Sequence, residues 1–240
     1  MIKRSTPITL ITITTVALIF FFMLYMNGFT NIRHNTDAKE GQIKVACVGD
    51  SVTYGHGIKN WPKNNYPALL GGMLGEKYNV GQFGESGLTV HPDGDQPYPQ
   101  SEVHSLSVAY EADILVFMLG SNDSKPGNWK GADEFKEKYL SLLDSYLQSE
   151  KQPHVYLCTP ATAYFPKGVT EGLTNYDIQP AVIEEIVEIV LEVASERGYE
   201  IIDINTLTEN RRDLFGIDNV HPNNEGAKAI ATAVYEAITK

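Results

Sequence analysis

The sequence has few cysteines and few basic residues, and each shortage excludes a class of protein. Its two cysteines, Cys47 and Cys158, are too few for a disulfide framework or a cysteine-rich zinc cluster. Nineteen lysines and arginines stand against thirty aspartates and glutamates, a net charge of −11, and no basic run could neutralise a phosphate backbone. We therefore expect no nucleic-acid partner, no metal and no cofactor.

Collagen-like and disordered classes are also excluded. Of the 240 residues, 42% are hydrophobic and 20% are charged, with 12 prolines and 20 glycines. A chain of this length and composition buries one full-sized core.

The N-terminus predicts export. Positions 8–26 carry no charge and follow Lys3 and Arg4, and a helix over them would be roughly 28 Å long, close to the thickness of a bilayer core. We expect residues 1–26 to be a signal anchor, with a cleaved signal peptide as the alternative, residues 27–40 to be a linker, and residues 41–240 to be the exported domain. The domain would be membrane-anchored outside the cytoplasm, or secreted if the segment is cleaved.

The domain alternates short apolar runs with amphipathic helices. Runs at positions 43–49, 78–83, 112–120, 154–160 and 199–204 are typical of strands buried on both faces. Helical periodicity is present over 135–147 and 178–193, and a third helix is expected over 223–239. This alternation predicts an α/β fold with a five-stranded parallel sheet covered by helices on both faces. In strand order 2-1-3-4-5, Cys47 and Cys158 would be separated by a strand, so both thiols should be free and buried.

Ser51 is the candidate nucleophile. It stands in the stretch GDSVTYG (49–55), directly after the first predicted strand, where loops of such a sheet carry the chemistry. A serine hydroxyl needs a base to take its proton and usually an acid to orient that base. The α/β-hydrolase signature G-x-S-x-G is absent.

His221 is the candidate base and Asp218 the acid that orients it. In DNVHP (218–222) the carboxylate lies three residues before the imidazole, so one short turn can bring them together. Pro222 suits the first position of the last helix, which predicts His221 as its N-cap, with the helix N-terminus favouring the neutral imidazole.

Two further loops offer donors for an oxyanion. Gly87, in GESG (84–87), exposes a backbone N–H without a side chain, and Asn122, in GSND (120–123), offers an amide. With the backbone N–H of Ser51, three donors would converge. We expect Asp50 and Asp123 to have structural roles, and we interpret the acidic stretch 91–95 as a surface loop rather than a calcium loop.

The four blocks GDSVTYG, GESG, GSND and DNVH, in this order, resemble those of the SGNH hydrolases, also called GDSL esterases and lipases. The resemblance covers nearly all of positions 43–240. It implies a flavodoxin-like three-layer α/β/α sandwich, a Ser51–His221–Asp218 triad, and an oxyanion hole made by Ser51, Gly87 and Asn122. Val52 replaces the leucine of GDSL, and Gln82 stands where the second block often begins with asparagine.

The segments 120–129 and 158–165 look most like family members that remove acetyl groups from carbohydrates. A small acyl ester, with an acetylated carbohydrate preferred, is therefore the expected substrate. The alternatives are a lysophospholipase or thioesterase acting on lipid acyl esters, and a membrane-tethered carbohydrate-binding protein without activity. Six aromatic residues are predicted on loops, where they could stack on sugar rings or acyl chains: Trp61, Tyr98, Trp129, Tyr164, Phe165 and Tyr176.

Overall fold

The computed structural model describes residues 34–148 and 151–240. It contains the predicted sheet, whose five strands are β1 (Ile43–Gly49), β2 (Tyr78–Gly84), β3 (Ile114–Met118), β4 (His154–Cys158) and β5 (Glu200–Ile202). All neighbours are parallel, in the order β2-β1-β3-β4-β5, as predicted.

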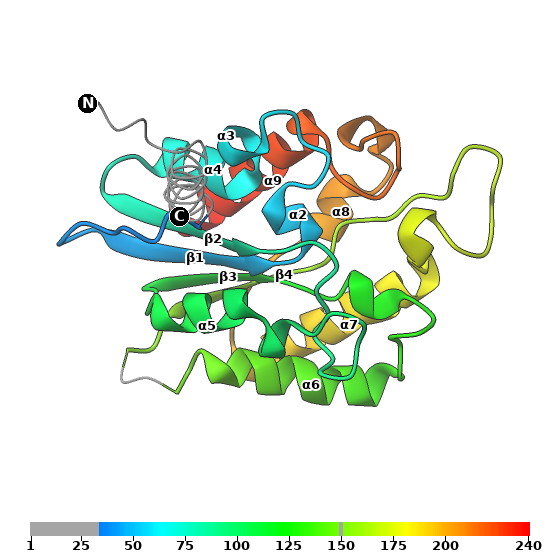
Figure 1. The fold of residues 1–240 in the computed structure, drawn as a ribbon, viewed down its shortest axis with the longest axis horizontal. Helices are drawn as coiled ribbons and strands as arrows, with labels where there is room; N and C mark the ends of the chain where they lie inside the picture. Colours follow the sequence, from blue (N-terminus) through cyan, green and yellow to red (C-terminus); the bar gives the residue numbers. More distant parts are fainter. Residues whose placement is uncertain (1–33, 149–150) are drawn as a thin grey trace, which may run out of the picture.

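Helices cover both faces of this sheet (Figure 1). One face carries α5 (Glu102–Ala109), α6 (Ala132–Ser145) and α7 (Pro180–Arg197). The other carries α2 (Ser51–Tyr54), α3 (Trp61–Asn64), α4 (Tyr66–Leu74), α8 (Ile204–Thr208) and α9 (Asn224–Ile238). Short 3-10 turns η1 (Tyr98–Gln100), η2 (Asn122–Ser124), η3 (Asn175–Asp177) and η4 (Arg212–Leu214) interrupt the loops. This is the expected three-layer arrangement.

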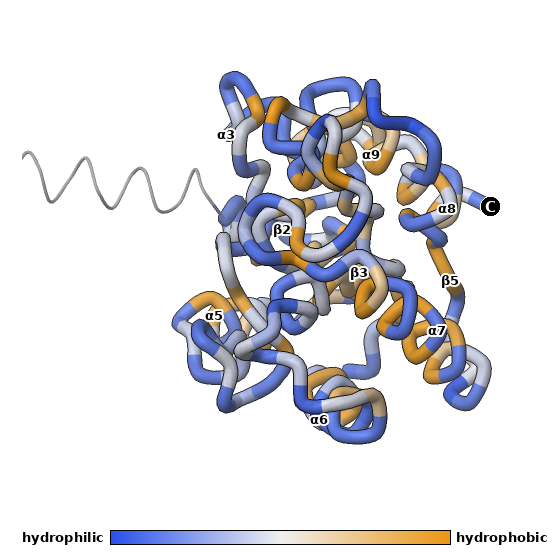
Figure 2. The backbone as a smooth tube through the Cα atoms, turned by 90° about the vertical axis from the view of Figure 1, so that its right-hand side faces the viewer, coloured by the Kyte–Doolittle hydropathy of each residue, from blue (hydrophilic) through white to orange (hydrophobic). Residues whose placement is uncertain are grey.

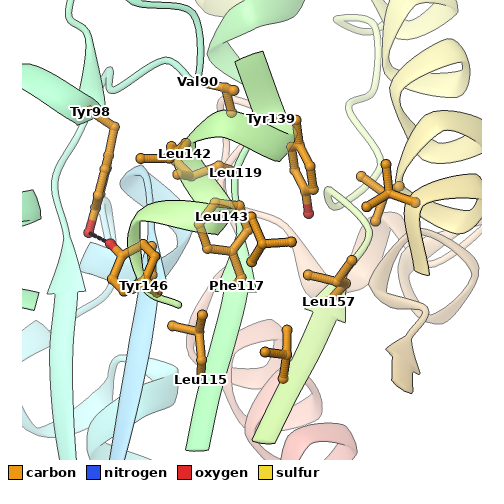
Figure 3. Packing of buried hydrophobic residues seen from close by; sticks show 14 of the residues in the cluster. Val90, Tyr98, Leu115, Phe117, Leu119, Tyr139, Leu142, Leu143, Tyr146 and Leu157 are labelled. Atoms are coloured by element: carbon orange, nitrogen blue, oxygen red, sulfur yellow. Dashed lines mark hydrogen bonds between the residues drawn. The ribbon is translucent and has the colours of Figure 1, made fainter. Parts of the chain in front are cut away.

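The core lies in two layers because successive strand residues point to opposite faces. In β3, Leu115 and Phe117 pack with the cluster under α6 and α7, whereas Val116 and Met118 pack with the cluster under α4 and α9. Figure 3 shows the first cluster, in which the Tyr146 hydroxyl lies 3.4 Å from that of Tyr98. Along the tube in Figure 2, apolar stretches alternate with polar ones in α6 and α7, as expected for helices with one buried side.

Proline and glycine mark the two ends of α7. Pro180 occupies the first turn of α7, where its missing N–H costs nothing, and Gly198 ends the helix in the left-handed conformation at φ 68°. Cys47 and Cys158 are free and buried, as predicted. Burial raises the pKa of the Cys47 thiol to about 12, so this thiol is not a nucleophile at neutral pH.

The segment predicted as a linker is described only from residue 34, and its end packs on the domain. His34 is buried and its Nδ1 lies 2.8 Å from the carbonyl oxygen of Gln82, while Asn35 donates to the carbonyl of Val80. The linker prediction therefore does not fit residues 34 and 35. The predicted anchor, 1–26, lies outside the described residues, and among those described no helix is long and apolar enough to cross a membrane.

Two glycines test how tightly the layers meet. A Cβ on Gly84 would lie 2.6 Å from the Tyr54 backbone nitrogen, whereas one on Gly72, inside α4, meets nothing within 4 Å. We expect Gly84→Ala to lower the free energy of unfolding by about 1–3 kcal/mol through overpacking, and Gly72→Ala to raise it by about 0.5–1 kcal/mol through helix propensity. Urea unfolding of both variants checks this, and equal effects would contradict it.

Candidate active site

Ser51 stands where β1 ends and α2 begins. The Asp50 carboxylate caps α2 by accepting a hydrogen bond of 3.0 Å from the Val52 N–H. The turn is tight because α2 rests directly on the strand ends: a Cβ on Gly49 would lie 2.0 Å from Oγ1 of Thr53. Gly49 is therefore required by close packing, and Gly55 ends α2 with φ 91°.

The structure brings Ser51, His221 and Asp218 together as predicted. Nε2 of His221 lies 2.9 Å from the Ser51 hydroxyl, and Nδ1 lies 2.9 Å from an Asp218 carboxylate oxygen. The other Asp218 oxygen accepts hydrogen bonds from the backbone N–H groups of Val220 and His221. With Nδ1–H donating to Asp218, Nε2 is left to accept the proton of Ser51.

The surroundings favour the neutral imidazole and the ionised carboxylate. Burial lowers the pKa of His221, and the nearby His56 lowers it further, against the opposing effect of Asp218. Partial burial of Asp218 opposes its ionisation, but the N–H groups of Val220 and His221 and the imidazole outweigh this and lower its pKa.

One prediction about His221 is wrong. Asn223, not His221, is the N-cap of α9, and its side chain accepts from the N–H groups of Glu225 and Gly226. The residues before it form a short bridge between Phe215 and Pro222, which keeps His221 outside the helix. The main cause that lowers the pKa of His221 is its burial, rather than a position at a helix N-terminus.

The predicted oxyanion donors line the same cavity as Ser51. Gly87 has φ 88°, which favours glycine, and a Cβ there would lie 2.8 Å from the Gln96 amide. The Asn122 amide donates to the carbonyl of Leu88 at 3.1 Å, and its second N–H remains for a ligand. The Ser51 N–H is at the first position of α2, where no intrahelical acceptor exists.

Asp50 and Asp123 have the structural roles that we expected. Asp123 is buried and accepts from the N–H groups of Val90 and His91, and so holds the loop that follows Gly87. Burial raises the pKa of Asp123 to about 7, with a further rise from Asp50. Burial likewise raises the pKa of Asp50 to about 6.

Several residues of the site carry no motif in the sequence. Asn128 is buried and ties the Asn122 carbonyl to the Asp95 carboxylate through one amide nitrogen. His56, which lacked a carboxylate at a suggestive spacing, has its ring centre 4.3 Å from that of His221. His56 lies three residues after GDSVT (49–53), but only the tertiary structure shows that this position is beside His221.

The stretch 91–95, predicted as a plain surface loop, is partly buried. His91 is 3% exposed, and its Nε2 lies 2.8 Å from a Glu134 carboxylate oxygen. The surface prediction is therefore wrong for His91, because α6 covers its ring.

His56, Asp218 and His221 are the one group that could hold a metal among the residues described, with ligand atoms within 4.8 Å of one another. Both nitrogens of His221 already contact Asp218 and Ser51. A metal would have to displace one of those contacts, so the donor set fits proton transfer better than metal binding.

The cavity beside Ser51 has a volume of about 210 Å³. Polar residues on its walls include Ser86, Gln96, Ser121 and Lys125. Its apolar residues include Ala161, Ala163, Ile178, Ile183 and Val220. An ester could lie here with its carbonyl between Ser51 and the donors.

The electrostatics of His221 can be tested by an NMR titration of the histidine rings. We expect a His221 pKa below the ordinary value of 6.5. Asp218→Asn should lower it further, because a charge that favours the imidazolium is lost. His56→Gln should raise it, because the neighbouring ring lowers it now. A His221 pKa above 6.5 in the unmutated chain would overturn this account.

The sequence is similar to a known protein family and to a named relative. The model of the GDSL-like lipase/acylhydrolase family matches residues 47–229. An acetylxylan esterase of Xylanibacter ruminicola is 36% identical over 218 residues, which cover 83% of this chain but only 44% of that protein. The chain thus spans less than half the length of this relative.

Solved structures show the same fold. A carbohydrate acetylesterase family member from Sinorhizobium meliloti has a TM-score of 0.63 at 19% identity, covering 82% of this chain and 97% of the other. A lipase/acylhydrolase from Enterococcus faecalis has a TM-score of 0.64 at 20% identity, covering 82% and 95%. By the family match and the 36% identical relative, the chain belongs to the GDSL-like lipase/acylhydrolase family.

Proposed function

We infer that this domain removes short acyl groups, acetyl above all, from carbohydrates, with Ser51 as nucleophile, His221 as base and Asp218 as the acid that orients it. One observation carries the inference: two hydrogen bonds of 2.9 Å join Ser51, His221 and Asp218 beside a cavity that Gly87 and Asn122 also line. Nucleophile, base and orienting acid stand in the order that acyl transfer needs.

In the first half of the reaction, the Ser51 oxygen attacks the ester carbonyl carbon while its proton passes to Nε2 of His221. The carbonyl oxygen becomes an oxyanion, which the backbone N–H groups of Ser51 and Gly87 and the Asn122 amide stabilise. The imidazolium forms next to the Asp218 carboxylate, which stabilises its charge. The C–O bond to the alcohol then breaks, the alcohol takes the proton from Nε2, and an acyl-serine remains.

In the second half, water takes the place of the alcohol. His221 accepts a proton from the water, whose oxygen attacks the acyl carbon. A second oxyanion collapses, the acyl group leaves as the acid, and the proton returns to Ser51. No cofactor enters either half.

Two observations support a short acyl group on a sugar. The cavity volume of about 210 Å³ lies below the roughly 300–1,000 Å³ of sites for drug-sized ligands. One relative is named an acetylxylan esterase, and one structural neighbour is named a carbohydrate acetylesterase family member. Both names describe removal of acetyl groups from carbohydrates. Export and anchoring through residues 1–26 stay predictions.

Substitution of Ser51, His221 and Asn122 tests the mechanism. Ser51→Ala or His221→Ala should remove nearly all turnover, because such residues act as a unit worth up to about a millionfold. Asn122→Ala should lower kcat about 100- to 1000-fold with the fold retained. The assay is hydrolysis of p-nitrophenyl acetate, and circular dichroism verifies folding. Full activity of Ser51→Ala would refute the proposed nucleophile, and inactivity of the unmutated chain would favour the binding-protein alternative.

The length of the acyl group is tested separately, with a series of p-nitrophenyl esters from acetate to octanoate. We expect kcat/KM to fall by at least about tenfold along the series, a difference of roughly 1.4 kcal/mol, because the cavity is small. A preference for octanoate would reject the acetylesterase proposal and favour a lysophospholipase or thioesterase.

A further inference from the structure

Of the aromatic residues predicted on loops, Tyr176 is the one that lines the cavity of Ser51 among the described residues. Four of the others pack against different partners, among them Trp61, whose ring centre lies 4.6 Å from that of Tyr54. Tyr98 is buried and donates to the Phe83 carbonyl, and the Trp129 ring packs 5.8 Å from that of Phe135. The Tyr164 ring lies beneath the Arg212 guanidinium. Tyr176 is therefore the ring of this set that lies beside Ser51.

The ring of Tyr176 flanks the imidazoles and is still half exposed. Its centre lies 4.9 Å from that of His221 at an interplanar angle of 76°, so the two rings meet edge to face. Its hydroxyl is 3.5 Å from Nε2 of His56. Because 51% of the residue remains exposed, a large part of its aromatic surface is open at the mouth of the cavity.

The backbone around Tyr176 is held in an uncommon conformation. Tyr176 and Asp177 have φ values of 62° and 60°, in the left-handed region that residues other than glycine avoid. The Asn175 amide donates to the Asp218 carbonyl at 2.6 Å, and Thr174 and Ile178 close the turn through their backbones. Such strain persists where contacts enforce it and is common in ligand-binding segments. The turn is thus tied to the loop of Asp218, which places the ring before any substrate arrives.

We propose that Tyr176 is the platform on which the pyranose ring of the substrate stacks, so that it sets the preference for a sugar alcohol over a simple alcohol. A pyranose has an apolar C–H face that suits the negative face of an aromatic ring, and hydroxyls around its edge. Gln96 and Lys125, on the same cavity, can bind those hydroxyls. Ser86 lies on the same cavity, and its buried hydroxyl has no hydrogen-bond partner among the described residues.

This inference rests on the proposed function, and the experiment separates the two. The full chain, Tyr176→Ala, Tyr176→Phe and Leu173→Ala are compared on methyl 3-O-acetyl-β-xylopyranoside, which keeps two free hydroxyls, and on ethyl acetate, which has no ring. Leu173 is the matched control because it lies on the same loop, is 41% exposed and does not line the cavity.

We expect Tyr176→Ala to raise KM for the acetylated sugar about tenfold, and to lower kcat/KM for the acetylated sugar at least about tenfold more than kcat/KM for ethyl acetate. Tyr176→Phe should keep the unmutated KM, because the ring is retained, and Leu173→Ala should change neither substrate. As a second readout, methyl β-xylopyranoside should inhibit ethyl acetate hydrolysis about tenfold less well in Tyr176→Ala than in Leu173→Ala.

Other results overturn the inference. Equal losses on both substrates in Tyr176→Ala would mean that the ring supports His221 rather than the sugar, and an unchanged KM would mean that it binds nothing. If the unmutated chain hydrolyses ethyl acetate but not the acetylated sugar, the sugar platform fails while the esterase mechanism survives. If it hydrolyses neither ester, the proposed function fails first.

Discussion

The site depends on the parallel pairing of β1 with both β2 and β3. The register sets Gly49 opposite Gly84 on one side and opposite Met118 on the other, so the three strands end at one level. Their following loops carry Ser51, Gly87 and Asn122, and leave the sheet side by side (Figure 1). A shift of one residue in either pairing would also reverse the faces of the side chains, which the two core layers forbid.

Close packing at the strand ends explains why small residues stand there. A side chain on Gly49 or Gly84 would collide with α2, so Ser51, the proposed nucleophile, can approach the sheet only because both positions are glycine. The buried carboxylates of Asp50 and Asp123 then hold α2 and the loop of Val90 and His91 by accepting backbone N–H groups. These contacts fix the donors relative to Ser51 before a substrate binds, which is the condition for electrostatic stabilisation of an oxyanion.

A different constraint holds His221, the proposed base, in the segment between the last strand and the last helix. The loop of Asp218 is tied to three other parts of the chain: to Tyr164 through the Asn219 carbonyl, to Asn175 through its own carbonyl, and to Ser51 through His221. The imidazole is therefore buried by residues distant in sequence, and this burial lowers its pKa. The lowered pKa of His221 is thus a property of the assembled site rather than of the segment 218–222.

The sequence by itself determined the strands, the main helices and the motif residues. Continuous apolar runs of strand length and apolar residues at a period of 3.6 are local signals, and so is the three-residue spacing of Asp218 and His221, which one turn brings together. What only the tertiary structure decided are contacts between segments far apart in sequence. His56 beside His221, Tyr176 at the cavity mouth and His34 against β2 leave no local pattern. The cap of α9 at Asn223 belongs to the same class, because the bridge between Phe215 and Pro222 delays the helix beyond the position that proline alone suggests.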